Sequence, residues 1–175
     1  MAKAKFQPEN TTEEWQLLLT RGTQLLQRGQ AQEAVALLER AVILADGNPD
    51  ILLNLSGAYI LTKKFKKAVE ILEPLSALEP ENVMIWTNLG AAYLGNPILA
   101  LDEEQQQAIA AFERAVEINP AAPHVAYNIG LIYRDRKEYE TAVSWFHRAL
   151  QANPHDQDAR NLIDRLQAQQ VEEEE

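Results

Sequence analysis

The chain has 175 residues, of which 46% are hydrophobic, and it carries a formal net charge of −10 with a pI of about 4.8. This length and apolar content are enough for a hydrophobic core, which excludes a chain that is disordered throughout. The absence of cysteine excludes disulfides, thiolate catalysis and cysteine-ligated zinc, and the acidic charge argues against general nucleic-acid binding.

The first ten residues are expected to form a flexible N-terminal tail. They lack the apolar core of a secretory signal, and no later stretch has the roughly 18 apolar residues that a membrane span needs. The first helix is predicted to begin at Thr11 or Thr12, with Glu14 completing a capping box. We therefore expect a cytoplasmic protein without membrane insertion.

Four copies of one pattern follow, and they occupy residues 15–48, 49–82, 83–122 and 123–156. Three copies are 34 residues long, and the third carries a six-residue insertion. Aligning "WTNLGAAY" with "AYNIGLIY" and "LLNLSGAY" places an asparagine at the sixth position of three copies, namely Asn54, Asn88 and Asn128. A fixed period of this length predicts a stack of repeated structural units.

Each copy reads as two helices that pack closely against each other. Positions 4, 7, 8 and 11 fall on one helical stripe, and position 8 is always small: Gly22, Ser56, Gly90 and Gly130. Proline near the end of a copy stops the second helix, as at Pro80, Pro120 and Pro154. One helix pair cannot bury its own apolar stripe, so neighbouring pairs must stack.

The insertion lies in the connection between the two helices of the third copy. Gly95, Asn96 and Pro97 end one helix, and Asp102 with Gln105 predicts a capping box for the next. Three aliphatic residues are left between them: Ile98, Leu99 and Leu101. They either form an apolar rim that contacts a partner or fill a gap against neighbouring helices, and the sequence leaves both interpretations open.

Charged residues gather at the helix–helix turns. Lysines lie at residues 63, 64, 66 and 67, basic residues at 134, 136 and 137, and the insertion contributes Asp102, Glu103 and Glu104. Since such turns lie along one edge of a helix stack, mutual neutralisation is expected there. An anionic-partner patch is the alternative.

The segment after the repeats predicts a capping helix over residues 157–170. Ala159, Leu162, Ile163 and Leu166 have the spacing of a one-faced helix, while its other face is charged. The remaining residues, 171–175, read "VEEEE" and are expected to be a solvated acidic tail without a site.

The repeats resemble the tetratricopeptide repeat family. The third copy has that family's pattern in full, at Trp86, Leu89, Gly90, Tyr93, Ala108, Phe112 and Pro120. The resemblance implies an all-α fold, a right-handed superhelical α-solenoid of antiparallel helix pairs over residues 11–156.

The resemblance further implies that a concave groove is lined by positions 2, 5, 6, 9, 12 and 13 of the first helices. The candidate partner-binding residues are therefore Leu19, Leu53, Asn54, Ile60, Met84, Asn88, Leu94, His124, Tyr127, Asn128 and Leu131. A carboxamide can both donate to and accept from a peptide backbone. The alternatives are that the apolar residues pack between repeats and that the asparagines bond their own helices.

The best-known ligand mode of the family, a clamp for a C-terminal carboxylate, does not fit this chain. Its three cationic positions are occupied here by Leu19, Met84 and Asn88. A carboxylate bound there would lack a charged partner.

No catalytic, metal or cofactor site is expected. His124, His147 and His155 share no ligand spacing, and the chain has no phosphate-binding glycine loop and no nucleophile–base arrangement. The favoured interpretation is a non-enzymatic adaptor that binds a peptide or amphipathic helix of another protein. A self-assembling scaffold, in which a neighbouring chain fills the groove of a homo-oligomer, is the alternative.

Overall fold

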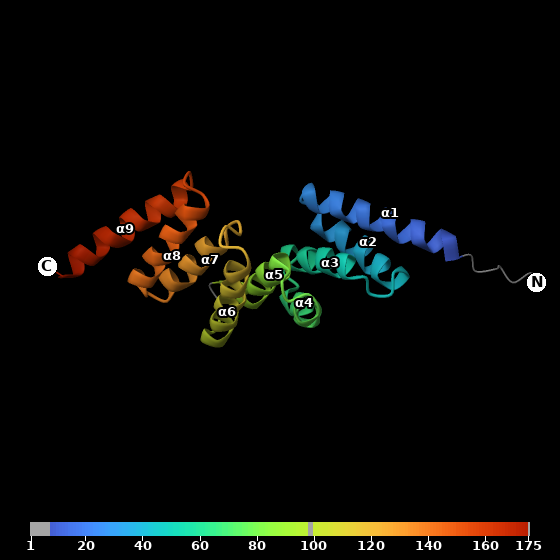
Figure 1. Ribbon diagram of the computed structural model, residues 1–175, viewed down its shortest axis with the longest axis horizontal. Coiled ribbons are helices and arrows are strands. Elements are labelled where there is room, and N and C mark those ends of the chain that lie inside the picture. The colour runs from blue at the N-terminus through green and yellow to red at the C-terminus, as the bar shows by residue number, and fades with distance from the viewer. Residues whose placement is uncertain (1–7, 98–99, 175) are drawn as a thin grey trace, which may run out of the picture. The chain divides into compact units, whose positions relative to one another are not determined.

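The computed structural model describes residues 8–97 and 100–174, with side chains over residues 13–97 and 100–169. This described part consists of helices and short connections, without a strand, and it divides into two compact units, residues 1–78 and 79–175. Figure 1 shows the helices in chain order.

Unit 1 contains two helix pairs. Its helices are α1 (Pro8–Gln27), α2 (Ala31–Leu44), α3 (Pro49–Leu61) and α4 (Phe65–Leu78). α1 packs on α2, α3 packs on α4, and α2 joins the pairs by packing against α3. The core is formed by buried aliphatic residues of these contacts, among them Leu38, Ile51 and Leu72.

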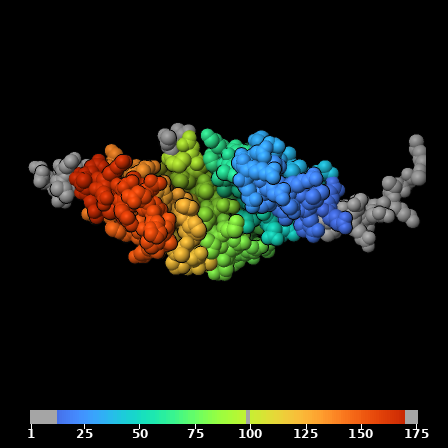
Figure 2. All heavy atoms as spheres, turned by 90° about the horizontal axis from the view of Figure 1, so that it is seen from above, coloured from blue at the N-terminus to red at the C-terminus, as the bar shows by residue number. Residues whose placement is uncertain are grey.

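Unit 2 contains two further pairs and a final helix. Its helices are α5 (Val83–Leu94), α6 (Asp102–Ile118), α7 (Val125–Asp135), α8 (Tyr139–Ala152) and α9 (Gln157–Glu174). The core joins Phe112, Ile129 and Phe146 to Ile163 and Leu166 of α9. The space-filling view shows α9, in red, lying directly against the orange segment of α8 (Figure 2).

The small residues at position 8 have the predicted role. A Cβ atom at Gly22 would lie 2.8 Å from the Leu38 side chain, and one at Gly90 would lie 2.6 Å from the Phe112 ring. Ser56 is fully buried, and its hydroxyl donates to the Leu53 carbonyl over 2.7 Å. The lack of a larger side chain therefore sets how closely the paired helices approach.

Side-chain caps decide where the first helices begin. Asn48 and Asn82 accept hydrogen bonds from the backbone N–H groups of Asp50 and Met84, and α3 and α5 start at the next residue. The equivalent residue before α7 is Ala122, whose side chain has no hydrogen-bond acceptor. α7 accordingly begins only at Val125, after a turn in which His124 adopts φ of 61°.

Both ends of the described chain differ from the sequence prediction. α1 begins at Pro8, inside the stretch expected to be a tail, because proline suits the first position of a helix. α9 continues to Glu174, beyond the expected end at residue 170, because glutamate is a good helix former. Residues 1–7 and 175 lie outside the described residues.

The start of α6 also differs in detail. Asp102 is its first residue rather than its cap, because the carboxylate of Glu104 accepts the backbone N–H of Leu101 over 2.8 Å. Asp102 is thereby left to pair with Arg136, which also donates to Glu138 over 2.7 Å. This ion pair is the neutralisation expected between the insertion and the basic turn of the fourth copy.

Candidate partner-binding site

In unit 2 the predicted residues lie on the first helices of the two pairs, except His124, which directly precedes α7. We call the surface formed by Met84, Asn88, Leu94, His124, Tyr127, Asn128 and Leu131 the α5–α7 face. Tyr127, Asn128 and Leu131 share one side of α7 because residues one turn apart stack along a helix. Met84 is 61% exposed, although methionine is apolar. The α5–α7 face therefore offers apolar and polar groups together.

A pocket of about 290 Å³ opens between α5 and α7. Leu94 of α5 and Leu131 and Ile132 of α7 give it apolar walls, and the carboxamide of Asn128 lies at its edge with Gln105 of α6. We call this cavity the α5–α7 pocket. An apolar cavity edged by a few polar groups is the usual form of a site that fixes the orientation of its ligand.

Two of the three asparagines have uncommitted carboxamides. Neither Asn88 nor Asn128 makes a side-chain hydrogen bond with another residue of the described part, and both are half-buried. A half-buried amide retains its capacity for two donated and two accepted bonds, which a partner's backbone can use.

Asn54 in unit 1 is different. Its Nδ2 donates to the Asp50 carbonyl over 2.8 Å, and its Oδ1 accepts from the Thr23 hydroxyl over 3.3 Å. The same two helices carry the predicted apolar residues Leu19 (α1), Leu53 and Ile60 (α3), and all three are half-buried. The equivalent surface of unit 1 is thus apolar, and its asparagine is largely engaged within the unit.

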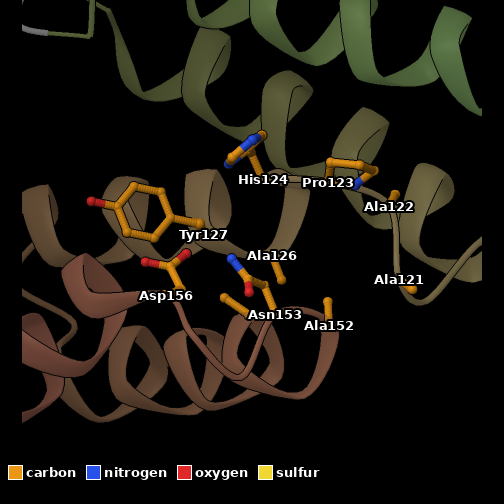
Figure 3. Close-up of a pocket in the computed structure, with 10 residues that line it drawn as sticks. Ala121, Ala122, Pro123, His124, Ala126, Tyr127, Ala152, Asn153 and Asp156 are labelled. Carbon is orange, nitrogen blue, oxygen red and sulfur yellow. The ribbon is translucent and has the colours of Figure 1, made fainter.

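A second cavity of about 240 Å³ lies at the start of α7, beside the end of α8 (Figure 3). Five alanines from the α6–α7 connection, α7 and α8 form its walls, and His124, Tyr127, Asn153 and Asp156 supply its polar groups. We call it the His124–Tyr127 pocket. His124 reaches it from the left-handed turn before α7, and the Tyr127 ring packs on Phe146 with centroids 5.6 Å apart.

The electrostatic environment of Tyr127 is negative. Burial raises the pKa of its phenol, and the carboxylates of Asp158 and Asp156 raise it further, while Arg134 lowers it. The guanidinium of Arg134 is itself bonded to Asp135, with Nε 2.8 Å from the carboxylate oxygen. The two aspartates at the start of α9 therefore dominate the potential at this phenol.

The insertion is described only in part. Leu101, the cap residue of α6, is 69% exposed, whereas Ile98 and Leu99 lie outside the described residues. Pro97 and Gln105, on either side of these aliphatic residues, both line the α5–α7 pocket.

Sequence reasoning missed several residues that line the two cavities, namely Pro97, Gln105, Asn153 and Asp156. Three of them, Pro97, Gln105 and Asn153, belong to connections or to the first turn of a helix. The helical repeat pattern does not predict where such side chains lie. Asp156 could have been predicted as a helix cap, because it occupies the same position in its copy as the capping residues Asn48 and Asn82. Its Oδ1 accepts the Ala159 N–H over 3.0 Å as a helix cap, and its place in a cavity follows only from packing.

The part of the chain that the structure describes lacks the features of a metal site and of a membrane span. It contains no group of three or more histidine, aspartate or glutamate side chains arranged to hold a metal ion. None of its helices is long and apolar enough to cross a membrane.

Comparison with known families decides the fold class. Tetratricopeptide repeat models match residues 25–94 and residues 102–157, which together cover most of the chain. The chain belongs to the tetratricopeptide repeat family. The two matches stop on either side of the insertion, which neither model covers.

Solved tetratricopeptide repeat structures have the same fold. A thermophilic protein of this family from Thermus thermophilus superposes with a TM-score of 0.73 at 23% identity, over 89% of this chain and 82% of that one. MamA from Desulfovibrio magneticus gives a TM-score of 0.70 at 22% identity, over 87% of this chain and 79% of that one. At such identities the likeness shows the fold alone.

Among curated proteins, the peroxisomal targeting signal receptor of Eremothecium gossypii is 26% identical over 108 residues, which are 58% of this chain. The match spans only 18% of that receptor's length. The all-α fold of stacked helix pairs and the general role of a protein–protein interaction scaffold are thus shown by the family, whose members are typically non-enzymatic. Neither the receptor's activity nor its partner transfers with them.

Proposed function

We propose that this chain is an adaptor that binds a peptide or an amphipathic helix of another protein across the α5–α7 face. In this proposal the face forms part of the concave tetratricopeptide repeat groove. Asn88 and Asn128 hold the partner's backbone, while Leu94 and Leu131 receive an apolar side chain. The adaptor has no catalytic role of its own.

The observation that carries the proposal is the pair of uncommitted carboxamides on the α5–α7 face, of which that of Asn128 belongs to a residue that lines the α5–α7 pocket. Leaving a half-buried polar group without a protein partner gains nothing for the isolated fold. A partner's backbone would satisfy both groups, and the pocket of about 290 Å³ is large enough for a leucine-sized side chain.

The apolar residues of unit 1 belong to the same proposal. Within unit 1, Leu19, Leu53 and Ile60 are proposed as apolar partner contacts of that unit by itself, and Asn54 would contribute only the hydrogen-bonding capacity that Thr23 and Asp50 leave free. Binding does not use a carboxylate clamp, because the cations that would pair with a terminal carboxylate are absent at the corresponding positions.

Leu101 is proposed as an apolar contact at the rim formed by the insertion, together with Ile98 and Leu99. Leu101 is the member of this group whose exposure is described. Because its side chain is 69% exposed and alanine, like leucine, offers no capping acceptor to α6, Leu101→Ala should leave the thermal unfolding midpoint unchanged. A loss of partner affinity in that variant would support a binding role, whereas unchanged affinity would contradict it.

Site-specific photo-cross-linking tests the adaptor proposal. A photoreactive phenylalanine analogue replaces Met84 on the α5–α7 face, and a matched control carries it at Ile43 of α2, which is 81% exposed. We expect irradiation in native extract to yield a discrete adduct with another protein from position 84 and none from position 43. An adduct only with a second copy of the chain would favour the self-assembling scaffold, and equal labelling from both positions would contradict a specific face.

A further inference from the structure

The His124–Tyr127 pocket contains acceptor atoms that the described part of the chain leaves unused. One oxygen of Asp156 caps α9 by accepting the Ala159 N–H, and the other has no hydrogen bond from a described residue. The hydroxyl of Tyr127 is likewise without a described partner. Figure 3 shows the Asp156 carboxylate next to the Tyr127 ring, with His124 on the opposite side of the opening.

The charges around the pocket select the type of ligand. Asp156 lines it, and both Asp156 and Asp158 act on the phenol of Tyr127. Two nearby cations are already engaged elsewhere: Arg134 bonds Asp135, and Arg160 donates to the Pro154 carbonyl over 2.8 Å. An anionic ligand would meet the carboxylate of Asp156 in the pocket, whereas a cation would be attracted by it; Arg134 acts on Tyr127 more weakly than either aspartate.

The walls fit a long aliphatic stem. Alanines such as Ala126, Ala149 and Ala152 line a space of about 240 Å³ without projecting side chains of their own. Lysine and arginine bury their methylene stems against apolar surface while the charged end keeps polar contacts. A neutral apolar side chain would fill the cavity but leave the hydrogen-bond acceptors of Asp156 and Tyr127 unpaired.

We propose that the His124–Tyr127 pocket receives a lysine or arginine side chain of the bound partner, whose cationic group pairs with Asp156 and Tyr127. This inference rests on the proposed function, since it specifies the chemistry of the partner at one end of the α5–α7 face. It makes the partner a basic peptide or helix, which the net charge of −10 attracts at long range.

Model compounds test the pocket independently of any partner. The isotope-labelled full chain is titrated with N-acetyl-arginine methylamide, N-acetyl-lysine methylamide and N-acetyl-citrulline methylamide, and the backbone amide signals of Tyr127 and Asp156 are followed by NMR. Citrulline has the shape of arginine without its charge. We expect saturable shifts with the arginine and lysine compounds and about tenfold weaker binding of citrulline, because a charge-assisted hydrogen bond is lost.

Asp156→Asn is the decisive variant, because asparagine keeps a capping oxygen for α9 and removes only the charge. It should weaken binding of the arginine compound about tenfold. Asp164→Asn, which neutralises an exposed aspartate of α9 outside the pocket, should leave binding unchanged. Equal binding of citrulline and arginine, an unaffected Asp156→Asn variant, or the absence of any saturable shift would each overturn the inference.

The two proposals fail in distinguishable ways. If the arginine compound does not bind while cross-linking from position 84 succeeds, the adaptor function stands and the basic-partner inference falls. If the compound binds but position 84 yields no adduct with another protein, the pocket is a cation site and the adaptor proposal is contradicted.

Discussion

Gly130 lies directly beneath the ring of Phe146, and a Cβ atom at residue 130 would stand 2.7 Å from Cε1 of that ring. No real side-chain contact is that short, so α7 and α8 can approach as they do only because residue 130 has no side chain. The ring of Phe146 is fully buried and also packs against Tyr127. This packing fixes how α7 lies on α8. It therefore also fixes where the α7 residues of the α5–α7 face are placed.

Gly130→Ala should destabilise the protein. Overpacking a filled core costs about 1–3 kcal/mol, which exceeds the roughly 1 kcal/mol that alanine gains over glycine in a helix. Denaturant unfolding should show a lower midpoint. Combining the change with Phe146→Leu should cost less than the sum of the two single variants, since leucine leaves room for the new methyl group; strict additivity would contradict the proposed contact.

Lys63→Gly should stabilise the protein. Lys63 adopts φ of 59°, and Gly29 occupies the same register of the first copy with φ of 75°. A non-glycine residue in this region carries about 1 kcal/mol of strain, which glycine relieves. The thermal midpoint should rise in Lys63→Gly and in Lys137→Gly, whose φ is 62°. It should fall in the control Lys66→Gly, which weakens the first turn of α4.

Tyr59 should make stability depend on pH in the alkaline range. Burial, followed by the hydrogen bond to Glu39, raises the pKa of its phenol from 10.0 to about 12. Because the folded-state pKa lies above the unfolded one, the stabilising contribution is complete below pH 10 and is lost as the pH rises through about 12. The free energy of unfolding should fall over this window, and less steeply in Tyr59→Phe.

The control for this titration is Glu39→Gln, which removes the carboxylate that accepts the phenol proton over 2.7 Å. Tyrosinate absorbance should then show one tyrosine titrating at lower pH than in the wild type. An identical titration curve in both proteins would contradict the assigned partner.

Arg136→Lys should cost about 1 kcal/mol at low salt. Arg136 is 24% exposed and donates from different guanidinium nitrogens to Asp102 and Glu138, which lysine cannot reproduce with the same planar geometry. The loss should shrink as salt screens the more exposed partners. Arg40→Lys, which alters an exposed pair with Glu14, should change the unfolding free energy much less.

The sequence predicted the helix pairs because their determinants are local and periodic. Position 8 is small in every copy, and the steric limits at Gly22, Gly90 and Gly130 follow directly from that pattern. The late start of α7 could also have been foreseen, since Ala122 replaces the capping asparagines found before α3 and α5.

The different states of the three asparagines could not be predicted from their shared position. Asn54 is engaged by the Asp50 carbonyl of its own helix, and it also lies 3.3 Å from the hydroxyl of Thr23, at position 9 of the preceding copy. The corresponding residue before Asn128 is Ala91, whose methyl group cannot form a hydrogen bond. The cavities were also beyond the sequence, since they combine loop residues such as Asp156 with helical residues from other repeats.

The most direct test of the central claim compares capture of the cross-linked partner by three immobilised proteins: the wild type, Asn88→Ala with Asn128→Ala, and Gln107→Ala with Gln151→Ala. The last removes the same number of amide groups from exposed positions of α6 and α8. The adaptor account predicts that the asparagine variant folds normally and loses the partner while the glutamine variant retains it. Full retention of the partner by the asparagine variant would contradict the account.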